Sequence, residues 1–506
     1  MTAPGTPSKL QGIIPRWEWR TFGHVIGPAE AAFAAMTSTG IQESDETYLL
    51  TVAGGSAKVR DDLMDVKLLR ETDADGLERW EPVMKASFPM SPDDVGTVLD
   101  ALGLRRPVID RDRYTLDEFV AAFGGGGAIR AVEVHKRRVR YKVNGCTSEV
   151  TDVVADGKPS KTIAIESEDK AAVLEAVRQT GLSGYLNTSY PKGLVATVED
   201  RPERYAVIDV GTNSVKFHVA ERDGAGFRPV ADRADVSRLG EGIQETGAIA
   251  PAAIERTVAA ITGMVDEAKR DGAVAIVVVG TAGLRMASNA GDVLVAVKAA
   301  TGVTIDVISG EDESRLAYLA AVSSLGVGDG TSVVFDTGGG SSQFTFGQGA
   351  RVDERFSVDV GAVRYTDRFG LDHAVGRDVV DEALTAIAAD LSRLDGRPKP
   401  DAVIGMGGGV TNITAVKHGL ATYDPDVVHG TVLDLAEIDR QIELYRTRDS
   451  DARREIVGLQ PKRAEVILAG ACIIRTILTK LEQQSMTVSD RGLRHGVLVE
   501  RFGAGT

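Results

Sequence analysis

Two short segments of this sequence place an aspartate between an apolar strand and a glycine turn. Val207-Ile208-Asp209-Val210-Gly211 aligns with Val334-Phe335-Asp336-Thr337-Gly338, and a serine follows three residues after each glycine. Glycine has no Cβ, so backbone N–H groups in such a turn can approach anionic oxygens closely. A surface turn would explain one copy equally well. Two copies with apolar flanks predict two similar lobes that face each other across a phosphate-binding cleft.

The turn residues are the candidates for phosphate binding, and the two aspartates are the candidates for metal binding. Aspartates beside a phosphate loop would repel the ligand unless a hard cation lay between them. Asp209 and Asp336 therefore indicate Mg²⁺ or Mn²⁺, held largely through water, and the alternative that both only cap turns stays open. The candidate phosphate ligands are Gly211, Thr212 and Asn213 in the first turn, with Gly338, Gly339, Gly340 and Ser341 in the second.

An acidic helix start follows the apolar run that ends at Ile308. Ser309 is a typical N-cap residue, and three acids, residues 311–313, come next. The helix dipole stabilises acids at this place whatever the function. Glu311 and Glu313 are two residues apart, so they cannot share a face of the helix. The residue types alone leave this cluster structural, with at most one carboxylate directed into the cleft.

Two further glycine-containing segments follow predicted buried strands and are expected to form loops. In residues 280–285, the guanidinium of Arg285 could bind a phosphate with two parallel hydrogen bonds. Residues 405–409 could approach a nucleotide or a phosphate chain. Taken singly, each segment is better explained by a tight turn or a close-packing contact.

The elements that must position these residues alternate between apolar strands and amphipathic helices. The segment 199–204 is short, charged and contains a proline, which predicts a linker. Pro251 opens a helix in which Ile254, Val258, Ile261 and Val265 have helical spacing. Apolar runs predict buried strands at 206–208, 274–279, 303–308 and 331–335. We expect an α/β protein in three parts: residues 1–198, a first lobe at 204–330 and a second lobe at 331–506.

The part before the linker has charged residues at every second position. Lys136, Arg138, Arg140 and Lys142 would share one face of a strand, and Arg16, Glu18 and Arg20 alternate with two tryptophans. Charged faces are normally solvated. Alternatively, such strands close into a barrel whose charged lumen holds a phosphate chain, with Lys136, Arg138 and Arg140 as ligands. We expect residues 1–13 to be frayed.

Composition narrows the function classes. The chain has 506 residues, too many for one core, and a net charge of −15, so we expect no nucleic-acid partner. Cys146 and Cys472 lack Cys-x-x-Cys spacing, which excludes a disulfide framework and a thiolate metal site. No apolar run approaches the roughly 18 residues of a membrane span, and the N-terminus lacks a signal pattern. We therefore expect a cytoplasmic protein with no membrane partner.

The segment from about Tyr205 to Phe502 resembles the exopolyphosphatase and guanosine pentaphosphate phosphohydrolase (Ppx/GppA) family. That family belongs to the actin-like, sugar-kinase-like ATPase superfamily, whose two-lobed fold is ribonuclease H-like. Besides the two aspartate turns, the resemblance is carried by residues 239–242 (LGEG), 280–285 (GTAGLR) with Asn289, 308–313 (ISGEDE), 361–364 (GAVR), 405–408 (GMGG) and 488–494 (VSDRGLR).

The resemblance assigns roles residue by residue. It implies that Glu313 is the catalytic glutamate that activates water, that Asp336 is a metal ligand, and that Asp209 is the acid of the first phosphate loop. Asn213, Arg285 and the amides of residues 338–341 match groups that hold phosphates. Relatives also suggest a homodimer. One departure bears on metal binding, because Gln343 stands where the family usually has glutamate.

The N-terminal part resembles, more weakly, the triphosphate-tunnel (CYTH) family. The matching segments are 17–20 (WEWR), 58–60 (KVR), the basic strand, 149–152, 165–168 (IESE) and Ser189-Tyr190. The resemblance implies an α+β domain built on an antiparallel β-barrel. The opening signature Glu-x-Glu-x-Lys reads Arg16-x-Glu18-x-Arg20 here, so one metal-binding acid is missing. We expect a polyphosphate-binding module that feeds the C-terminal site.

Together these patterns favour an exopolyphosphatase that releases orthophosphate from inorganic polyphosphate. Hydrolysis of guanosine pentaphosphate is the first alternative, because it presents the same terminal anhydride. An ATP-dependent kinase is disfavoured, because Glu313 suits water activation and no sugar-binding signature stands out. A catalytically weak polyphosphate or alarmone sensor is the non-enzymatic alternative, which Gln343 and Arg16 favour.

Overall fold

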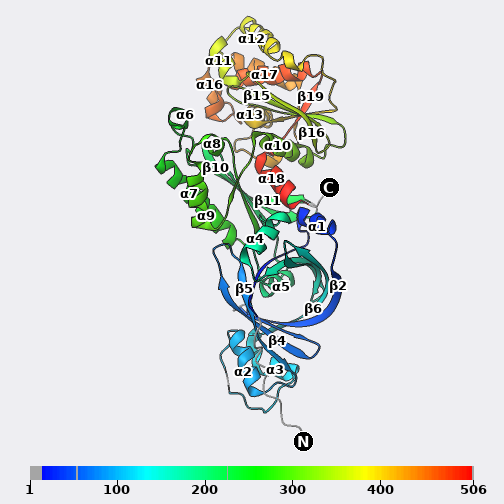
Figure 1. The fold of residues 1–506 in the computed structure, drawn as a ribbon. Helices are drawn as coiled ribbons and strands as arrows, with labels where there is room; N and C mark the ends of the chain where they lie inside the picture. Colours follow the sequence, from blue (N-terminus) through cyan, green and yellow to red (C-terminus); the bar gives the residue numbers. More distant parts are fainter. Residues whose placement is uncertain (1–13, 53–54, 107, 225, 504–506) are drawn as a thin grey trace. The chain divides into compact units, whose positions relative to one another are not determined.

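The computed structural model describes residues 14–52, 55–106, 108–224 and 226–503 (Figure 1). Residues 1–13, which the sequence predicts to be frayed, lie outside these ranges. The contacts divide the chain into two compact units, residues 1–307 with 500–506 and residues 308–499. No helix in the described ranges is both long and apolar enough to cross a bilayer.

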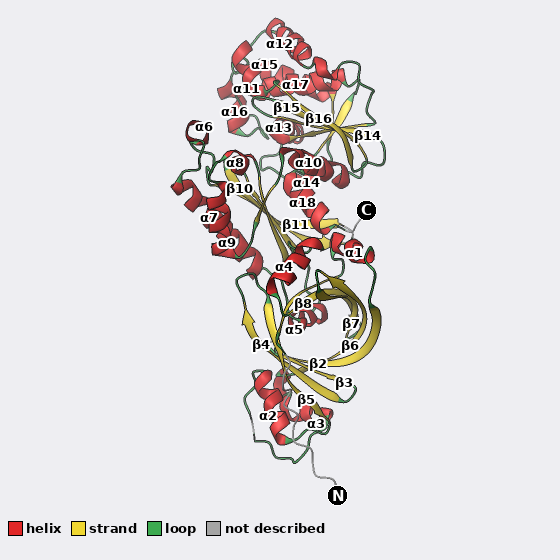
Figure 2. Cartoon of the chain, in the orientation of Figure 1, coloured by secondary structure: helices red, strands yellow, loops and turns green. Residues whose placement is uncertain are grey.

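The first unit begins with eight antiparallel strands that close into a barrel (Figure 2). Their order is β1-β5-β4-β3-β2-β6-β7-β8, so β1 and β8 complete the ring. The barrel confirms the antiparallel fold that the charged alternation and the CYTH resemblance predict. The bounds are β1 Arg16–Gly23, β2 Gly40–Leu50, β3 Ser56–Arg60, β4 Leu63–Thr72, β5 Glu78–Ser87, β6 Arg130–Val143, β7 Cys146–Ala155 and β8 Lys158–Ser167.

Short helices accompany the barrel and make the domain α+β. The helix α5 contacts β1, β2, β7 and β8, and Figure 1 draws it against the barrel. It packs closely because Gly193 has no side chain: a Cβ there would lie 2.2 Å from the ring of Phe22. The helices are α1 Gly27–Ala34, α2 Pro92–Ala101, α3 Leu116–Phe123, α4 Lys170–Gln179 and α5 Tyr190–Val198, with a 3₁₀ turn at Gly125–Gly127.

A five-stranded sheet, ordered β11-β10-β9-β12-β13, completes the first unit. β9 and β10 form an antiparallel hairpin, and β12 lies parallel to β9. The predicted strands and the predicted helix start at Pro251 are confirmed, and Ile261 and Val265 are buried. The bounds are β9 Arg204–Val210, β10 Ser214–Asp223, β11 Gly226–Val236, β12 Ala273–Gly280 and β13 Ile305–Val307, with α6 Ile243–Thr246, α7 Pro251–Arg270, α8 Ala282–Met286 and α9 Ala290–Thr301.

The second unit is built on a six-stranded sheet ordered β16-β15-β14-β17-β19-β18. Its core surrounds α17 (Ile467–Lys480), which is almost entirely buried. The strands are β14 Thr331–Thr337, β15 Ser342–Gln348, β16 Arg351–Val358, β17 Ala402–Met406, β18 Val432–Asp434 and β19 Ser485–Val488. The other helices are α10 Gly310–Ser324, α11 Ala362–Phe369, α12 Arg377–Asp390, α13 Gly407–His418, α14 Pro425–Val428, α15 Leu435–Arg446, α16 Ser450–Arg454 and α18 Leu493–Phe502, with 3₁₀ turns at Ser392–Leu394 and Pro461–Arg463.

The two sheets repeat one topology, as the paired aspartate turns predict. In each, a meander of three antiparallel strands is followed by a parallel strand beside the first, β12 beside β9 and β17 beside β14. The turns also match in detail, because Gly211 N donates to Ser214 O at 3.0 Å and Gly338 N to Ser341 O at 2.9 Å. The sequence repeat therefore reflects a structural repeat.

Within the first unit, residues 184–190 join the barrel to the five-stranded sheet. On one side, Ile276 N of β12 donates to Gly184 O at 2.8 Å, and Leu186 N donates to Val274 O at 2.9 Å. On the other side, Thr188 N donates to Arg20 O at 2.8 Å, and Arg20 N donates to the Asn187 side chain at 2.6 Å. One short segment is thus hydrogen-bonded to both β12 and β1.

Candidate active site and the charged barrel lumen

The first aspartate, Asp209, lies near the end of β9 and is only 3% exposed. Its cross-strand neighbour on β10 is Lys216, whose Nζ donates to Asp209 Oδ2 at 3.3 Å. The other oxygen, Oδ1, is buried and accepts no hydrogen bond from the described residues. Leaving a buried carboxylate oxygen without a donor is costly, and a hard cation would satisfy it.

Glycines from two neighbouring segments hold the turn that follows Asp209. Gly240 N donates to Thr212 O at 2.7 Å, and a Cβ on Gly240 would lie 2.1 Å from the Thr212 methyl group. A Cβ on Gly283 would lie 3.2 Å from Thr212 Cα. Asn213 is exposed, and its carbonyl oxygen accepts from the amides of Ser237 and Arg238. The glycines of the 239–242 and 280–285 motifs are therefore needed to fix this turn.

Residues 280–285 do not form the predicted loop, because the short helix α8 begins at Ala282, directly after β12. Thr281 makes the transition: its amide donates to Val210 O at 3.2 Å, and its carbonyl accepts from Arg285 N at 3.1 Å. Arg285 is exposed at the end of this turn. Asn289 holds the next segment by hydrogen bonds to both backbone groups of Ile249, so its part in the motif is structural.

The second aspartate, Asp336, lies on β14 between Gln343 of β15 and Met406 of β17. Its carboxylate is placed against the start of α13. A Cβ on Gly407 would lie 2.0 Å from Asp336 Oδ1, and the φ of Gly407 is +84°. Only glycine tolerates both conditions without strain. The predicted 405–409 loop is therefore wrong: Gly407 turns β17 straight into α13, and the space left by its missing side chain accommodates Asp336.

The glycine turn after Asp336 is fixed by hydrogen bonds to its backbone carbonyls, and it ends at the hydroxyl group of Ser341. Ala362 N donates to Gly338 O and Val363 N to Gly339 O, each at 2.9 Å. A Cβ on Gly361 would lie 2.3 Å from Gly339 O, which explains that glycine. Gln343 Nε2 donates to Ser341 Oγ at 2.8 Å. A glutamate in the place of Gln343 could not make this donation when ionised.

The candidate base, Glu313, lies in the first turn of α10 and is partly exposed. The predicted N-cap is confirmed, because Ser309 Oγ accepts from Asp312 N at 3.0 Å and donates to Asp312 Oδ2 at 2.8 Å. The hydrogen bond from Ser309 lowers the pKa of Asp312. Asp312 thus serves the cap, and Glu311 is exposed near Arg355 at 3.6 Å.

The described geometry brings the predicted residues together in two groups. Asp209, the 211–213 turn and the start of α8 form one group in the first unit, where Thr281 bonds Val210. Asp336, the 338–341 turn and Gln343 form the other group in the second unit. Glu313 also belongs to the second unit. The sharing of one cation by Asp209 and Asp336 stays a prediction.

Comparison of this chain with known proteins identifies its family. A model of the Ppx/GppA phosphatase family matches residues 218–503. The chain belongs to the Ppx/GppA phosphatase family. Exopolyphosphatase 2 of Mycobacterium tuberculosis is 28% identical over 330 residues, which are 59% of this chain and 99% of that protein. Two crystal structures of Aquifex aeolicus Ppx/GppA proteins are 32% identical, cover 59% of this chain and 99% and 97% of theirs, and give TM-scores of 0.56 and 0.54.

These similarities confirm the C-terminal resemblance and its two-lobed, actin-like fold. The Ppx/GppA match begins at residue 218, so it leaves the barrel outside. The barrel is therefore an addition to the Ppx/GppA part, and its chemistry must be read from its own residues.

The barrel lumen contains a highly charged cavity of about 200 Å³. Side chains of β1 and β6, the two strands that the charged alternation singles out, line it together with side chains of other strands such as β8. Four carboxylates, Glu18, Asp65, Glu149 and Glu166, face an excess of cations. The seven cationic side chains among the described lining residues are Arg20, Lys58, Arg60, Lys67, Lys136, Arg138 and Arg140.

Lys136 and Arg138 point inward from β6, so the interpretation of a solvated charged face is wrong for them. Lys136 is 1% exposed and Arg138 is 7% exposed. Arg140 lies further along the strand at the exposed end of the lining. Lys142 is exposed and donates to Thr147 Oγ1 at 3.0 Å. The last of the four basic residues therefore does not line the lumen.

Glu46, which the sequence reading did not single out, is the central counter-ion of this lumen. Its side chain is completely buried and bonded to Lys136 Nζ at 2.8 Å and to Arg138 Nη2 at 2.7 Å. Lys58 follows at 3.0 Å. Burial alone would raise the pKa of Glu46, but Lys136 and Lys58 outweigh it and hold that pKa below its usual range. The period-two alternation of Ser44, Glu46 and Tyr48 on β2 is the signal that could have found it.

Two tyrosines form the apolar side of the cation cluster. Tyr48 and Tyr190 are stacked with ring centroids 5.1 Å apart. The ammonium of Lys136 lies 4.5 Å from one ring centroid and 3.8 Å from the other, and it donates to Tyr48 Oη at 2.7 Å. Burial lowers the pKa of Lys136 well below its usual range. Tyr190 thus explains the Ser189-Tyr190 part of the CYTH resemblance.

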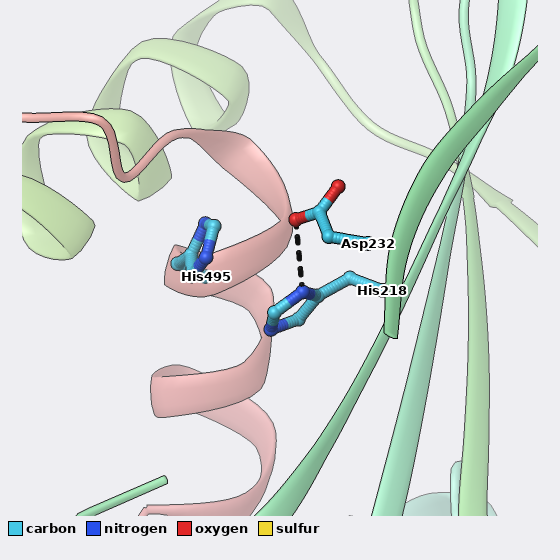
Figure 3. A group of neighbouring side chains, drawn as sticks. All are labelled: His218, Asp232 and His495. Carbon is cyan, nitrogen blue, oxygen red and sulfur yellow. Dashed lines mark hydrogen bonds and ion pairs between the residues drawn. The ribbon is translucent and has the colours of Figure 1, made fainter. Parts of the chain in front are cut away.

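A pair formed by the buried His218 and the partly exposed Asp232 lies outside both sites. His218 of β10 and Asp232 of β11 are cross-strand partners, and His218 Nδ1 is 3.1 Å from Asp232 Oδ2 (Figure 3). His495, also drawn there, belongs to α18 and to the second unit. The pair stabilises the hairpin of β10 and β11, and none of the motif residues belongs to it.

Proposed function

We propose that this Ppx/GppA protein is an exopolyphosphatase, which releases orthophosphate from the end of inorganic polyphosphate by metal-assisted attack of water. The observation that carries the proposal is the repeated aspartate–glycine hairpin, found in both sheets of a chain that belongs to the family. The similarity to an exopolyphosphatase over 99% of that protein's length supports the choice of substrate.

The backbone turns hold the phosphates in this proposal. Gly211, Thr212 and Asn213 contact the chain in the first unit, and the amides of residues 338–341 contact it in the second. Their carbonyls are already occupied by hydrogen bonds from neighbouring segments, so the turns are preorganised before substrate arrives. Arg285 adds a guanidinium. Preorganised donors lower the barrier because they need no rearrangement as charge develops.

Glu313 is the proposed base. It accepts a proton from the attacking water, and its place on the first turn of α10 is fixed by the Ser309 cap. In phosphoryl transfer, correct placement of the water and neutralisation of charge account for most of the acceleration.

Asp209 and Asp336 are the proposed ligands of Mg²⁺ or Mn²⁺. Both fit this role, because Asp209 has a buried oxygen without a donor among the described residues, and Asp336 lies in the space that Gly407 leaves open. When bound, the cation would neutralise charge on the phosphate oxygens.

One assay tests the proposal. The purified full chain with Mg²⁺ is offered long-chain polyphosphate, tripolyphosphate, guanosine pentaphosphate and ATP, and orthophosphate release is followed for wild type and Glu313→Gln. We expect release from polyphosphate by wild type only. Equal, slow release by both proteins would favour the alternative of a weakly catalytic sensor, and a preference for guanosine pentaphosphate would favour the other alternative.

The barrel is proposed to bind polyphosphate and feed it to the Ppx/GppA part. The excess of cations among its lining residues supports this role, with Lys136, Arg138 and Arg140 as the ligands. The functional division into residues 1–198, 204–330 and 331–506 belongs to the same proposal, as do the cytoplasmic location, the homodimer and the absence of nucleic-acid and membrane partners.

A further inference from the structure

Three carboxylates of the barrel, those of Glu18, Glu149 and Glu46, are already paired with cations of the chain. Glu18 Oε1 accepts from Arg20 Nε at 2.6 Å, and Glu149 Oε1 accepts from Arg20 Nη2 at 3.3 Å. Glu46 is enclosed by Lys136, Arg138 and Lys58. These three acids are thus engaged by guanidinium or ammonium groups, whereas Asp65 Oδ1 is buried and accepts no hydrogen bond from the described residues.

A fourth carboxylate, that of Glu166, is paired with Arg16. Arg16 is the first residue of β1, and its Nη1 donates to Glu166 Oε1 on the facing strand β8 at 3.4 Å. Glu166 lies opposite Glu18 on the paired strands, and burial together with the nearby Glu18 raises the pKa of Glu166. Arg16 places a guanidinium at this corner, where the two carboxylates could otherwise bind a metal ion.

The donor set does not suit a hard divalent cation. Mg²⁺ requires oxygen ligands near 2.0–2.1 Å in octahedral geometry, and Ca²⁺ requires six to eight oxygens. In the described part of the barrel, no three carboxylate or imidazole groups offer ligand atoms within 4.8 Å of one another. The guanidinium of Arg20 stands between Glu18 and Glu149 and would repel a cation placed there.

The same cations suit an anion well. Arginine forks bind phosphate oxygens with two parallel hydrogen bonds, and charge-assisted bonds of this kind are about twice as strong as neutral ones. Arg20, Lys136 and Arg138 are each at least nine-tenths buried and line the cavity. Their charge is therefore weakly screened by salt. Seven lining cations face four lining carboxylates and the buried Glu46, so the lumen keeps a positive surplus even with its internal ion pairs formed.

We propose that the barrel binds a short run of a phosphate chain directly through its arginines and lysines, without a divalent cation. The inference rests on the proposed function of the barrel and adds its mode of recognition. The anion takes over hydrogen bonds that Glu46 and Glu149 hold in the free protein. The barrel therefore retains its ligand under conditions in which the metal-dependent active site cannot work.

The test uses the full chain and tripolyphosphate, titrated by calorimetry in EDTA and then in Mg²⁺. We expect tripolyphosphate to bind in EDTA at one site per chain. Mg²⁺ should change this affinity less than about threefold, after correction for the metal–tripolyphosphate complex. Arg138→Gln should weaken that binding at least tenfold. Arg137→Gln is the matched control, because Arg137 is the neighbouring residue on β6 and is exposed. Loss of wild-type binding in EDTA, or binding unchanged by Arg138→Gln, would overturn the proposal.

Two more variants keep the proposal testable if Arg138→Gln does not fold, as judged by circular dichroism. Glu46→Gln removes the competing carboxylate and should tighten binding in EDTA, whereas a metal-ligand role for Glu46 requires weaker, Mg²⁺-dependent binding. Arg16→Glu restores the missing acid beside Glu18 and Glu166, and it should make binding depend on Mg²⁺. The comparison of orthophosphate release by wild type and Glu313→Gln tests the active site, and tripolyphosphate binding in EDTA tests the barrel, so failure of the barrel proposal and failure of the proposed function are distinguishable.

Discussion

The barrel lumen and the glycine turns of the two sheets are both suited to binding phosphate, but they offer different kinds of ligand groups. The lumen uses buried side-chain charges, which pair with Glu46, Glu18 and Glu149 in the free protein. The turns use backbone geometry, fixed by carbonyl hydrogen bonds and by glycines whose Cβ would collide with a neighbour. Side-chain cations supply most of the attraction in the first region, whereas backbone amides supply most of the proposed contacts in the second.

This difference suits the lumen to binding the phosphate chain and the turns to placing a phosphate for reaction. A cluster of ion-paired cations can follow a flexible anion, because lysine and arginine side chains rearrange among several partners. A backbone turn cannot rearrange, so it places a phosphate at one position relative to a base. We infer that a variant in the turns changes the rate of reaction most, whereas a variant in the lumen changes affinity most.

The largest effect should come from Glu313→Gln. Loss of a general base typically reduces the rate about 10²- to 10⁴-fold, so kcat for orthophosphate release from polyphosphate should fall by that factor. Binding of tripolyphosphate in EDTA should stay unchanged. Glu311→Gln is the matched control on the same helix turn, exposed and near Arg355, and should keep kcat within about twofold. Equal losses for the two variants would contradict the assignment.

Next in size is Gly407→Ala. The added Cβ would lie 2.0 Å from Asp336 Oδ1, at a φ of +84°. Strain of this kind costs roughly 1–3 kcal/mol, so we expect a lower melting temperature of the second unit and loss of Mg²⁺-dependent activity. Gly409→Ala is the control, because a Cβ there meets no heavy atom within 4 Å. Full activity in Gly407→Ala would show that Asp336 does not need its present position.

A smaller effect is expected from Gln343→Glu, which restores the acid usual in the family. The new carboxylate cannot donate to Ser341 Oγ, but it adds an oxygen ligand beside Asp336 on the paired strand. We expect the Mg²⁺ concentration for half-maximal activity to fall several-fold. Gln348→Glu, at the far end of the same strand, is the control for added charge. A rise in the Mg²⁺ requirement would refute a metal-side role for this position.

The smallest effect concerns pH and separates the two regions again. Burial, with Glu18 nearby, raises the pKa of Glu166, and burial lowers the pKa of Lys136. A bound anion favours the protonated form of both groups, so binding takes up protons and tripolyphosphate affinity should increase a few-fold as pH falls from 8.5 to 6. Calorimetry in buffers of different ionisation enthalpy would detect the uptake. Affinity that rises with pH would contradict the sign.

Most of the fold could be predicted because it follows from periodicity. The runs at 206–208, 274–279 and 331–335 became β9, β12 and β14, and Pro251 does open α7. The basic alternation of β6 predicted a charged lumen. The two glycine segments expected to be loops were misjudged, since a glycine directly after a buried strand allows a helix to start at once. Composition cannot distinguish that case from a loop.

Only the site residues that belong to a local sequence motif could be predicted. Asp209, Asp336 and their turns were found because the pattern occurs twice. Glu46 was missed because its importance comes from Lys136, 90 residues away in the chain, and from Arg138. The contact between Gly407 and Asp336 could not be predicted either, because pairing of parallel strands brings together residues that are distant in sequence. Such pairings depend on strand register, which a single sequence leaves open.

The segment 184–190 makes the barrel and the first sheet one cooperative body. Cutting the chain at the linker after residue 198 would strip the amide and carbonyl partners of Val274 and Ile276 from β12, leaving an open strand edge prone to aggregate. Since a ligand that binds only the native form stabilises everything that unfolds with its site, a phosphate chain in the barrel should protect the neighbouring sheet against heat and proteases. The enzyme would then resist unfolding and proteolysis most strongly when polyphosphate is abundant.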